Sequence, residues 1–478
     1  MQTPDTSAIG ARRTHKAIVV GAGITGLAVS RYLGEHGIEH VVLERAADLG
    51  GIWRSERWPG VRCDTEIVSY SYGFRPLVAD RPLVSGAVIL RYLEDVARAC
   101  GTLDRIRFGT TVHRASFDDR SGLWLVDTSR GRFATKFLIN ANGYFADEPY
   151  LPRIPGVEDF RGAVVHLSRL SAAADLAGRR VILVGSGAAA VSAAPALCAR
   201  CDSVTLLQRS PSYIFEDPNE LGPFSRLARR LQAAGLAWPI ALVRFGNRIK
   251  NDLIFLTFRR FPGAGKAFFR RHWRRSLDAE TFDESFQPRY DPWEQRIPVA
   301  VGLRESLRSG KLRIVTGRID RFTETAVVLR GGRRVAGDLC VLATGHDLDL
   351  FKFPLFRGGR RIETAGINFY KGMMLGGVPN YFHPFGVVHA TWTQRIERVA
   401  KLITKIVLYV ERRRFATVAV DRKPVPQRPR ITPNYIMRSL PSLPAMYGTL
   451  ELPSVDDWLC FAFRRRDYRF SRTRGGDA

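Results

Sequence analysis

The sequence feature that most constrains the fold is a strand–turn–helix–strand pattern that occurs twice, in residues 16–46 and in residues 179–210. Each copy begins with a short run rich in β-branched residues, continues through a glycine-rich turn into a helical stretch, and ends in a second apolar run. Such continuous apolar runs are typical of parallel strands that are covered on both faces. The repeat therefore predicts an α/β chain with two units of the same kind.

The glycine spacing of the first unit points to a dinucleotide. Gly21 allows a tight turn, Gly23 lets the backbone approach a pyrophosphate, and Gly26 lets the helix pack closely on the strand. The N-terminus of the helix then offers free N–H groups to phosphate oxygens. Glu44 ends the second strand, where a carboxylate accepts hydrogen bonds from ribose hydroxyls. This unit is predicted to bind FAD or NAD.

The second unit has the turn Gly185-Ser186-Gly187 and a different residue type at the end of its second strand. Arg209 and Ser210 stand where the first unit has its acid. A guanidinium pairs with the oxygens of a ribose 2′-phosphate, which a carboxylate would repel. This unit is predicted to bind NADPH, and an ordinary surface role for Arg209 is the alternative.

Two further strand–glycine turns, at residues 139–145 and at residues 338–349 with Gly345, indicate where the chain crosses between the two units. The expected fold is α/β, with two Rossmann-like dinucleotide-binding domains and a mostly helical insertion. A helix is also expected over 395–413. The expected division is 1–150 and 343–462 for the domain of the first unit, which binds FAD or NAD, 151–216 and 290–342 for the NADPH-binding domain, 217–289 for the insertion, and 463–478 for a basic disordered tail.

The chain is strongly basic, with a net charge of +27 over 478 residues. Residues 225–275 contribute 13 Lys and Arg against the single acid Asp252, and aromatic residues alternate with these charges. Arginine-rich solvation of the surface is one explanation. Peripheral contact of 225–275 with an anionic membrane is the second, and nucleic acid, which we do not expect as a partner, is the third.

Nothing in the N-terminal residues resembles a signal peptide, and the apolar run 236–243 is too short to span a bilayer. A cytoplasmic protein is expected, with membrane association left open. The six cysteines form no disulfide framework at this length. Cys198 and Cys201 have the spacing of a redox pair, but they lie at the far end of the second unit's helix and are interpreted as structural. No metal site is expected.

Several stretches resemble the class B flavoprotein monooxygenases and, within them, the Baeyer–Villiger monooxygenases. The resemblance rests on GGIW at 50–53, WPGVRCD at 58–64, QRSPSYIF at 208–215, YDPWEQR at 290–296, YKGMM at 370–374 and HATWT at 389–393. It covers about residues 15 to 445 and is strongest toward the subgroup that contains ethionamide monooxygenase. It implies FAD and NADPH as cofactors and molecular oxygen as co-substrate.

The resemblance also implies roles for individual residues. In the family, NADPH-reduced flavin forms a C4a-peroxide that attacks the carbonyl of a small hydrophobic ketone or aldehyde and gives an ester or lactone. Arg296 matches the arginine that stabilises the charges of this reaction, and Asp64 matches the acid that positions it. A structural ion pair is the alternative for both. Gly51, Trp53 and Asp64 match positions that contact FAD.

The sequence departs from the family pattern at two places. Gln295 stands where many members have a lysine that contacts NADPH. The family fingerprint Phe-x-Gly-x-x-x-His-x-x-x-Trp retains Phe160, Gly162 and His166, but Leu170 replaces the tryptophan. Oxygenation of nitrogen, sulfur or carbon on the same scaffold therefore stays open, as does a flavoprotein oxidoreductase that transfers no oxygen. The oligomeric state is left open.

Overall fold

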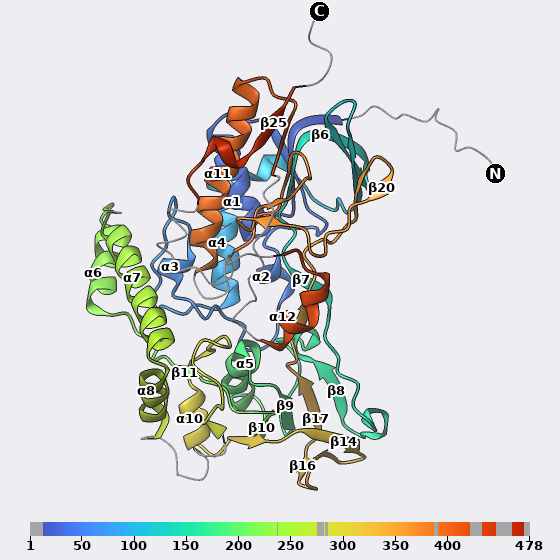
Figure 1. Cartoon of the computed structure of the whole chain (residues 1–478). Coiled ribbons are helices and arrows are strands. Elements are labelled where there is room, and N and C mark those ends of the chain that lie inside the picture. Colours follow the sequence, from blue (N-terminus) through green and yellow to red (C-terminus); the bar gives the residue numbers. More distant parts are fainter. Residues whose placement is uncertain are drawn as a thin grey trace, which may run out of the picture.

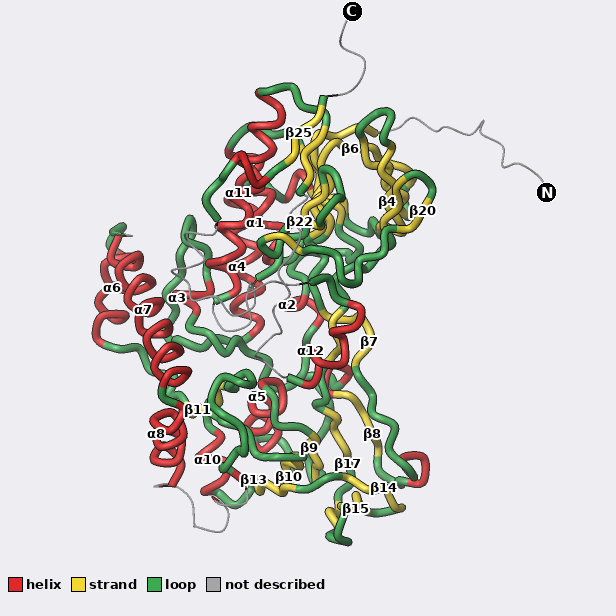
Figure 2. Tube along the Cα trace, viewed as in Figure 1, coloured by secondary structure: helices red, strands yellow, loops and turns green. Residues whose placement is uncertain are grey.

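The computed structural model describes residues 13–236, 238–274, 282, 285–386, 391–420, 433–445 and 461–472. Two sheets with helices on their faces occupy the two ends of the molecule, and a side arm of three helices projects from one flank (Figures 1 and 2). This is the predicted α/β class, with the two strand–turn–helix repeats in different sheets.

The first sheet has nine strands in the order β20-β19-β4-β5-β6-β1-β2-β3, and β23 also pairs with β6. Around the first repeat its strands are parallel, with Ile18 of β1 beside Val41 of β2 and Leu138 of β6. The strands of this sheet are β1 Arg13–Val20, β2 His40–Leu43, β3 Ile106–Arg107, β4 Val112–Asp118, β5 Leu123–Thr128, β6 Gly131–Asn140, β19 Leu355–Arg357, β20 Arg360–Arg361 and β23 Tyr381–Phe382.

The first sheet is covered on both faces, which is why β1 is apolar without alternation. Ala17 and Val19 pack into a core with helices α1, α4 and α11, whereas Ile18 and Val20 pack into the core on the opposite face. The helices are α1 Ile24–Glu35, α2 Ile52–Ser55, α3 Ile67–Tyr70, α4 Gly86–Ala99, α11 Trp392–Arg412 and α12 Asn434–Ser439. The helix expected at 395–413 is thus present and begins three residues earlier.

The second sheet has five parallel strands in the order β13-β10-β9-β17-β8. Its strands are β8 Ala163–His166, β9 Arg180–Val184, β10 Ser203–Gln208, β13 Leu312–Thr316 and β17 Leu339–Leu342, with α5 Ala188–Cys198 and α10 Leu303–Arg308 as helices. A small antiparallel sheet of β14 Ile319–Thr323, β15 Ala326–Leu329 and β16 Arg334–Ala336 follows β13.

The chain passes between the two sheets at the two strand–glycine turns that the sequence indicated. It leaves β6 of the first sheet through β7, Phe145–Pro149, and returns from β17 of the second through β18, His346–Leu348. These two linkers pair with each other as an antiparallel ribbon. Short strands complete the fold: β11 Phe215–Glu216, β12 Val299–Ala300, β21 Phe369–Tyr370, β22 Met374–Leu375, β24 Thr417–Ala419 and β25 Arg469–Ser471.

The expected insertion is mostly helical, with α6 Pro223–Ala233, α7 Trp238–Arg260 and α8 Pro262–Arg274. The expectation of a disordered tail from residue 463 is wrong for residues 465–471. A 3₁₀ turn at Arg465–Asp467 leads into β25, which pairs antiparallel with β24. The reason is aromatic packing, because Phe470 contacts the rings of Tyr409 and Phe415. Residues 473–478 lie outside the described residues.

Candidate active site

A cavity of about 1880 Å³ lies between the two sheets and is lined by both glycine turns. The ends of β1 and β2 reach it from the first sheet, and the ends of β9 and β10 reach it from the second. Helix α2, the β7–β18 ribbon and α12 lie between the sheets (Figure 2). Crevices at the carboxyl ends of parallel strands are the usual place for ligands in α/β folds. The cavity is therefore the candidate site.

The first glycine turn has the geometry that its sequence predicts. Gly21 has a φ of 103°, and a Cβ there would lie 2.7 Å from the carbonyl oxygen of Ala141. A Cβ on Gly26 would lie only 1.8 Å from the carbonyl oxygen of Gly21, so this position admits no side chain. Gly23 is the N-cap of α1. The strand, turn and helix are consequently as close together as a bare backbone allows.

A second glycine approaches the first turn from the other side. Gly51 has a φ of 55°, and a Cβ there would lie 3.1 Å from the Cα of Gly23. Glu44 is buried, and its carboxylate accepts hydrogen bonds from the backbone N–H of Ala22 at 2.6 Å and of Ala46 at 2.8 Å. Trp53 donates its indole N–H to the hydroxyl of Tyr70 at 3.0 Å. All of these residues except Ala22 line the cavity.

The second glycine turn repeats the arrangement. Gly185 has a φ of 137°, and its N–H donates to the carbonyl of Leu207 at 2.9 Å. Gly187 is the N-cap of α5, with no atom within 4 Å of where its Cβ would be, so the space in front of the helix is open. Arg209 and Ser210 follow β10 and line the cavity as predicted.

Arg296 and Asp64, 232 residues apart, form an ion pair on the cavity wall. One guanidinium nitrogen of Arg296 donates to both carboxylate oxygens of Asp64, at 2.8 and 2.6 Å. The Asp64 carboxylate raises the pKa of Arg296, so the guanidinium stays charged. Its side chain is 42% exposed and that of Asp64 only 13% exposed. The arginine is thus held from behind and keeps N–H donors for a bound molecule.

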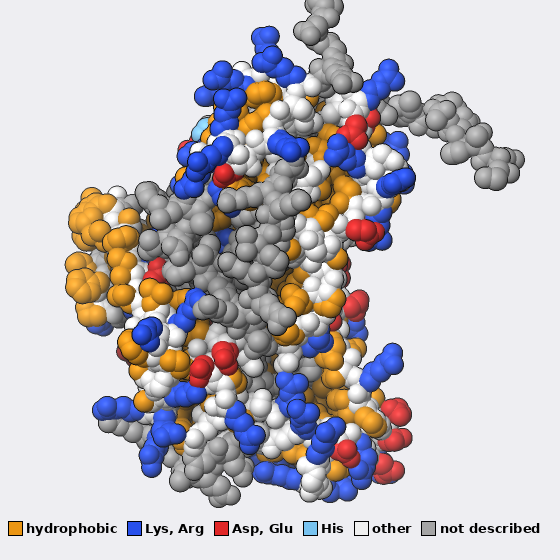
Figure 3. Space-filling model, viewed as in Figure 1, with side chains coloured by type: hydrophobic (Ala, Val, Ile, Leu, Met, Phe, Trp, Pro, Cys, Tyr) orange, Lys and Arg blue, Asp and Glu red, His pale blue; other side chains and the backbone are white. Residues whose placement is uncertain are grey.

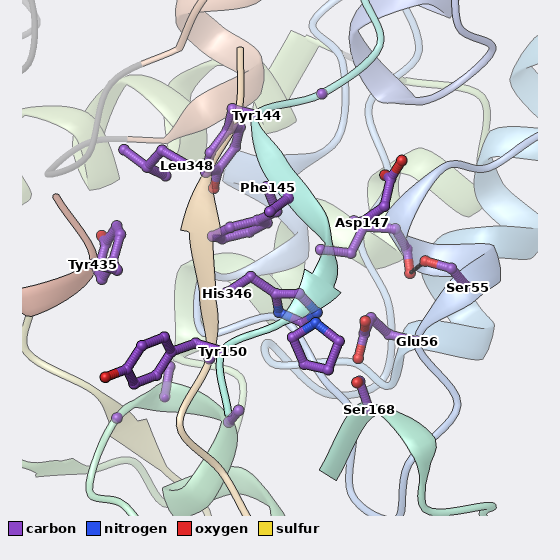
Figure 4. Close-up of a pocket in the computed structure, with 18 of the residues that line it drawn as sticks. Ser55, Glu56, Tyr144, Phe145, Asp147, Tyr150, Ser168, His346, Leu348 and Tyr435 are labelled. Carbon is purple, nitrogen blue, oxygen red and sulfur yellow. Dashed lines mark hydrogen bonds between the residues drawn. The ribbon is translucent and has the colours of Figure 1, made fainter. Parts of the chain in front are cut away.

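The sequence prediction missed an aromatic wall beside this ion pair. Figure 4 shows Tyr144, Phe145, Tyr150 and Tyr435 on one side of the cavity, with Ser55, Glu56, Asp147 and Ser168 on the other and His346 between them. Tyr144 and Tyr435 are electrostatic neighbours of Arg296. Tyr144 follows directly after the turn glycine Gly143, which is a signal that could have identified it. Tyr435 had none, because α12 comes from a proline-rich region.

The fingerprint residues have different surroundings. Phe160 packs edge-on against Phe322, and Gly162 has no room for a side chain because its Cβ would meet the Phe160 ring at 2.4 Å. Both positions are structural. Leu170 is buried in the core of the second sheet with Leu167 and Leu176. The position that departs from the family pattern is thus filled as an ordinary core position.

His166 is the fingerprint residue that reaches the cavity. Its Nδ1 accepts a hydrogen bond from the backbone N–H of Ser168 at 3.2 Å, so the neutral ring carries its proton on Nε2. Within the described residues, the buried Nε2 has no hydrogen-bond partner. The ring lies edge-to-face with His346 at 5.5 Å. Burial and the neighbouring His346 lower the pKa of His166 to about 4.

The residues present fit two dinucleotides. Each glycine turn opens onto the cavity at a helix N-terminus, where backbone N–H groups bind phosphate. One turn has a carboxylate at its ribose position, Glu44, and the other has an arginine, Arg209. Arg318 and Arg330, which the sequence prediction did not include, also line the cavity. The Cys198–Cys201 pair is buried in the core of the second sheet, in agreement with its structural interpretation.

Fold and site together define a protein with two dinucleotide-binding units that face a common cavity. The family model described as flavin-binding monooxygenase-like matches residues 14–378, which is most of the chain. This chain belongs to that family. It is also similar to the FAD-containing monooxygenase EthA of Mycobacterium tuberculosis, with 32% identity over 444 residues that cover 89% of this chain and 90% of EthA.

Solved structures of two monooxygenases share the fold. An oxidized steroid monooxygenase bound to NADP superposes with a TM-score of 0.77 at 22% identity, and covers 96% of this chain and 100% of its own. An open crystal structure of cyclohexanone monooxygenase gives 0.75 at 22% identity with the same coverage. At this identity the likeness concerns the fold, and it confirms the predicted arrangement of two Rossmann-like domains.

Proposed function

We propose that this chain uses FAD, NADPH and molecular oxygen to convert a hydrophobic ketone or aldehyde into an ester or lactone, which is a Baeyer–Villiger oxidation. The observation that carries the proposal is the Arg296–Asp64 pair, which places a permanently charged donor on the wall of a cavity shared by two dinucleotide turns. The similarity to an FAD-containing monooxygenase and to an NADP-bound structure supports the choice of cofactors.

The two turns divide the cofactors between them. The turn at Gly21, with Glu44 at the ribose position, would hold FAD, and the turn at Gly185, with Arg209, would hold NADPH. Bound FAD supplies the chemistry that activates oxygen at the expense of NADPH. This chain's residues orient the two nucleotides, exclude water and stabilise charge.

The part assigned to Arg296 is electrostatic. Attack on a carbonyl places negative charge on the carbonyl oxygen, and a fixed guanidinium lowers the energy of that charge more than that of the neutral substrate. Asp64 holds the guanidinium in one orientation through its two hydrogen bonds. It thereby removes the rotational freedom that would weaken the interaction at the moment of reaction.

The aromatic wall supports a hydrophobic substrate. Tyr144, Phe145, Leu348 and Tyr435 all line the cavity. Tyr144 also packs on Trp392, with ring centroids 4.7 Å apart, so its ring is held in place. Rigid rings of this kind offer large apolar contact area together with a few hydroxyl groups that fix orientation.

Product analysis tests this proposal. The FAD-loaded protein is supplied with NADPH, ¹⁸O₂ and either a cyclic ketone or an alkyl aryl sulfide. We expect one labelled oxygen in the lactone, with NADPH consumed in proportion. A labelled sulfoxide without any lactone would mean that the protein oxygenates a heteroatom and does not oxidise a carbonyl compound. NADPH oxidation that yields only hydrogen peroxide with every substrate tried would contradict an oxygenase.

We also infer that the basic residues 225–275 meet a membrane surface, as the charge pattern indicated. Their 13 Lys and Arg against one acid support it. None of the helices in the described residues is long and apolar enough to cross a membrane. The inferred contact is therefore peripheral.

A further inference from the structure

Helix α7 of the insertion turns one row of large apolar side chains away from the protein. Trp238 is 63% exposed, Phe245 is 61% exposed and Leu242 is 60% exposed. We call the set to which they belong the apolar stripe; it consists of Trp238, Leu242, Phe245, Ile249, Leu253 and Leu256. Monomeric proteins rarely leave so much contiguous apolar surface in water unless it meets a partner.

The apolar stripe has helical spacing. Its members are three or four positions apart from Trp238 to Leu256, so they form one face of the helix. With a rise of about 1.5 Å per residue, this face is about 27 Å long. Phe224 and Leu227 of α6 are also exposed, at 83% and 54%, and α6 packs on α7. Figure 3 shows hydrophobic side chains gathered at this flank of the molecule.

The inner face of α7 holds the helix to the protein through the buried Ile240 and through polar contacts. Arg244 donates to the carbonyl oxygens of Val68 at 2.6 Å and of Ser71 at 2.7 Å. Asn247 donates to Glu66 at 2.8 Å, and Lys250 forms an ion pair with the same carboxylate at 3.3 Å. These contacts fix the rotation of the helix about its axis. The apolar stripe is therefore held outward by the fold.

Basic side chains are exposed on the same three helices. The exposed bases of α6, α7 and α8 are Arg226, Arg230, Lys250, Arg259, Arg260, Lys266, Arg270, Arg271 and Arg274. A helix with apolar side chains on one side and Lys or Arg beside them is the pattern that lies in the interface of an anionic bilayer. There the apolar groups leave water and the bases meet lipid phosphates.

We propose that α6–α8 are a membrane-docking element, and that the apolar stripe enters the headgroup–acyl boundary of an anionic leaflet while the exposed bases of these helices contact phosphate groups. This makes the peripheral contact inferred above specific, and it does not depend on the proposed reaction. A second copy of this chain fits less well. Pairing the same face of two molecules would bring two basic surfaces together, and like charges at an interface are unfavourable.

The test is co-sedimentation of the full-length, flavin-loaded protein with vesicles of phosphatidylglycerol and phosphatidylcholine, and with vesicles of phosphatidylcholine alone. One variant changes the stripe, Leu242→Ser/Phe245→Ser/Ile249→Ser, and a second changes charge, Arg226→Gln/Arg230→Gln. Leu151→Ser is the matched control, because Leu151 is 50% exposed but lies outside α6–α8. Retained flavin absorbance and an unchanged melting temperature show that each variant is folded.

We expect the wild type to sediment with the anionic vesicles and the stripe variant to bind at least about tenfold more weakly, since each buried side chain adds to the transfer free energy. The charge variant should lose binding mainly at low salt, and Leu151→Ser should bind like the wild type. The emission of Trp238 should shift to the blue on binding, with the shift absent in Trp238→Phe.

Two results would overturn the proposal. One is wild-type protein that stays in the supernatant with anionic vesicles at low salt. The other is a stable dimer in vesicle-free buffer that the stripe variant converts to monomer while vesicle binding is unchanged, because the apolar stripe would then be a contact between copies of this chain. Oxygenase activity enters neither result, so failure of the proposed reaction stays distinguishable.

Discussion

The guanidinium of Arg296 is oriented by Asp64, a residue that is remote in the sequence and adjacent in space. Asp64 comes from a loop of the first half of the chain, and Arg296 follows the helical insertion. Their side chains meet at 2.6 Å on the cavity wall, with the arginine the more exposed of the two. An ion pair with this asymmetry can orient a cation toward a ligand.

The first prediction concerns this pair. Arg296→Ala should lower kcat for oxygenation by about 10² to 10³, because it removes a donor that acts on developing charge. Reduction of bound flavin by NADPH should change little. Arg98→Ala is the matched control, because Arg98 forms a surface ion pair with Asp95 on α4. Steady-state kinetics and stopped-flow flavin reduction provide the two readouts, and an equal loss in both would contradict an electrostatic role in oxygenation.

The second prediction concerns coenzyme choice. Arg209→Ala should raise KM for NADPH about tenfold or more and leave KM for NADH nearly unchanged, since a charge-assisted hydrogen bond to phosphate contributes about 1.5 to 3 kcal/mol. Arg330→Ala is the comparison, because Arg330 lines the same cavity. If only Arg330→Ala shows the selective loss, the 2′-phosphate lies at the other arginine and the assignment from the strand end is wrong.

At the scale of elements, the two halves of the chain meet where a loop of the first packs on α5 of the second. Trp58 follows the first repeat in the sequence, but its side chain packs in the core of the second sheet. Two residues later, Gly60 has a φ of 85°, and a Cβ there would lie 2.5 Å from the carbonyl oxygen of Ser192 and 2.9 Å from the Cβ of Ala196. This contact fixes the distance between the two halves.

The third prediction follows from that contact. Gly60→Ala should lower the free energy of unfolding by about 1 to 3 kcal/mol, through the positive φ and the clash together. Gly37→Ala is the matched control, because Gly37 has a φ of 67° but no atom within 4 Å of its Cβ position. It should show only the smaller conformational cost. Denaturant unfolding measures both, and equal losses would mean that the packing against α5 contributes nothing.

Helix α7 shows that the periodicity of apolar residues predicts a helix but does not determine which face of it packs on the protein. The alternation of Arg with large apolar residues predicted a helix correctly, and the usual expectation would bury its apolar face. In the structure the apolar stripe faces outward instead, because Arg244 and Asn247 on the opposite face donate hydrogen bonds to carbonyl and carboxylate oxygens of residues 66–71. Those partners belong to another part of the chain, so the sequence of α7 alone does not predict these contacts.

At the scale of the whole molecule, burial keeps a set of histidines neutral. It lowers the pKa of His383 to about 3 and that of His166 to about 4. The pKa values of His40, His272 and His346 are lowered in the same direction for the same reason. In the unfolded chain a histidine has a pKa of about 6.5. Below that pH the unfolded state therefore binds more protons than the folded state.

The fourth prediction is the resulting pH dependence of stability. The free energy of unfolding should fall as the pH drops from about 6.5 toward about 4, because stability rises with pH wherever the unfolded state binds more protons. Thermal melts over this range measure the slope. His383→Gln should flatten it, and His113→Gln, at an exposed position, should not. An unchanged slope in His383→Gln would contradict this account.

The sequence by itself determined the two strand–turn–helix units and predicted a ligand for each, because glycine spacing, strand ends and the residue at each strand end are local features. It also identified Arg296 and Asp64, through resemblance to a family. The two units could be predicted from short-range geometry, because the positive φ of Gly21 and of Gly185 belongs to the turn itself.

Only the tertiary structure decided which side chains contact one another and which face the cavity, the core or the solvent. It brought Arg296 to Asp64, placed Tyr435 and His346 on the cavity wall, and ordered residues 465–471 by aromatic packing. It buried Leu170 in a core, and it turned the apolar stripe of α7 outward. Each of these outcomes depends on contacts between segments far apart in the chain. Packing and hydrogen-bond partners from elsewhere select among orientations that are equally compatible with the local sequence.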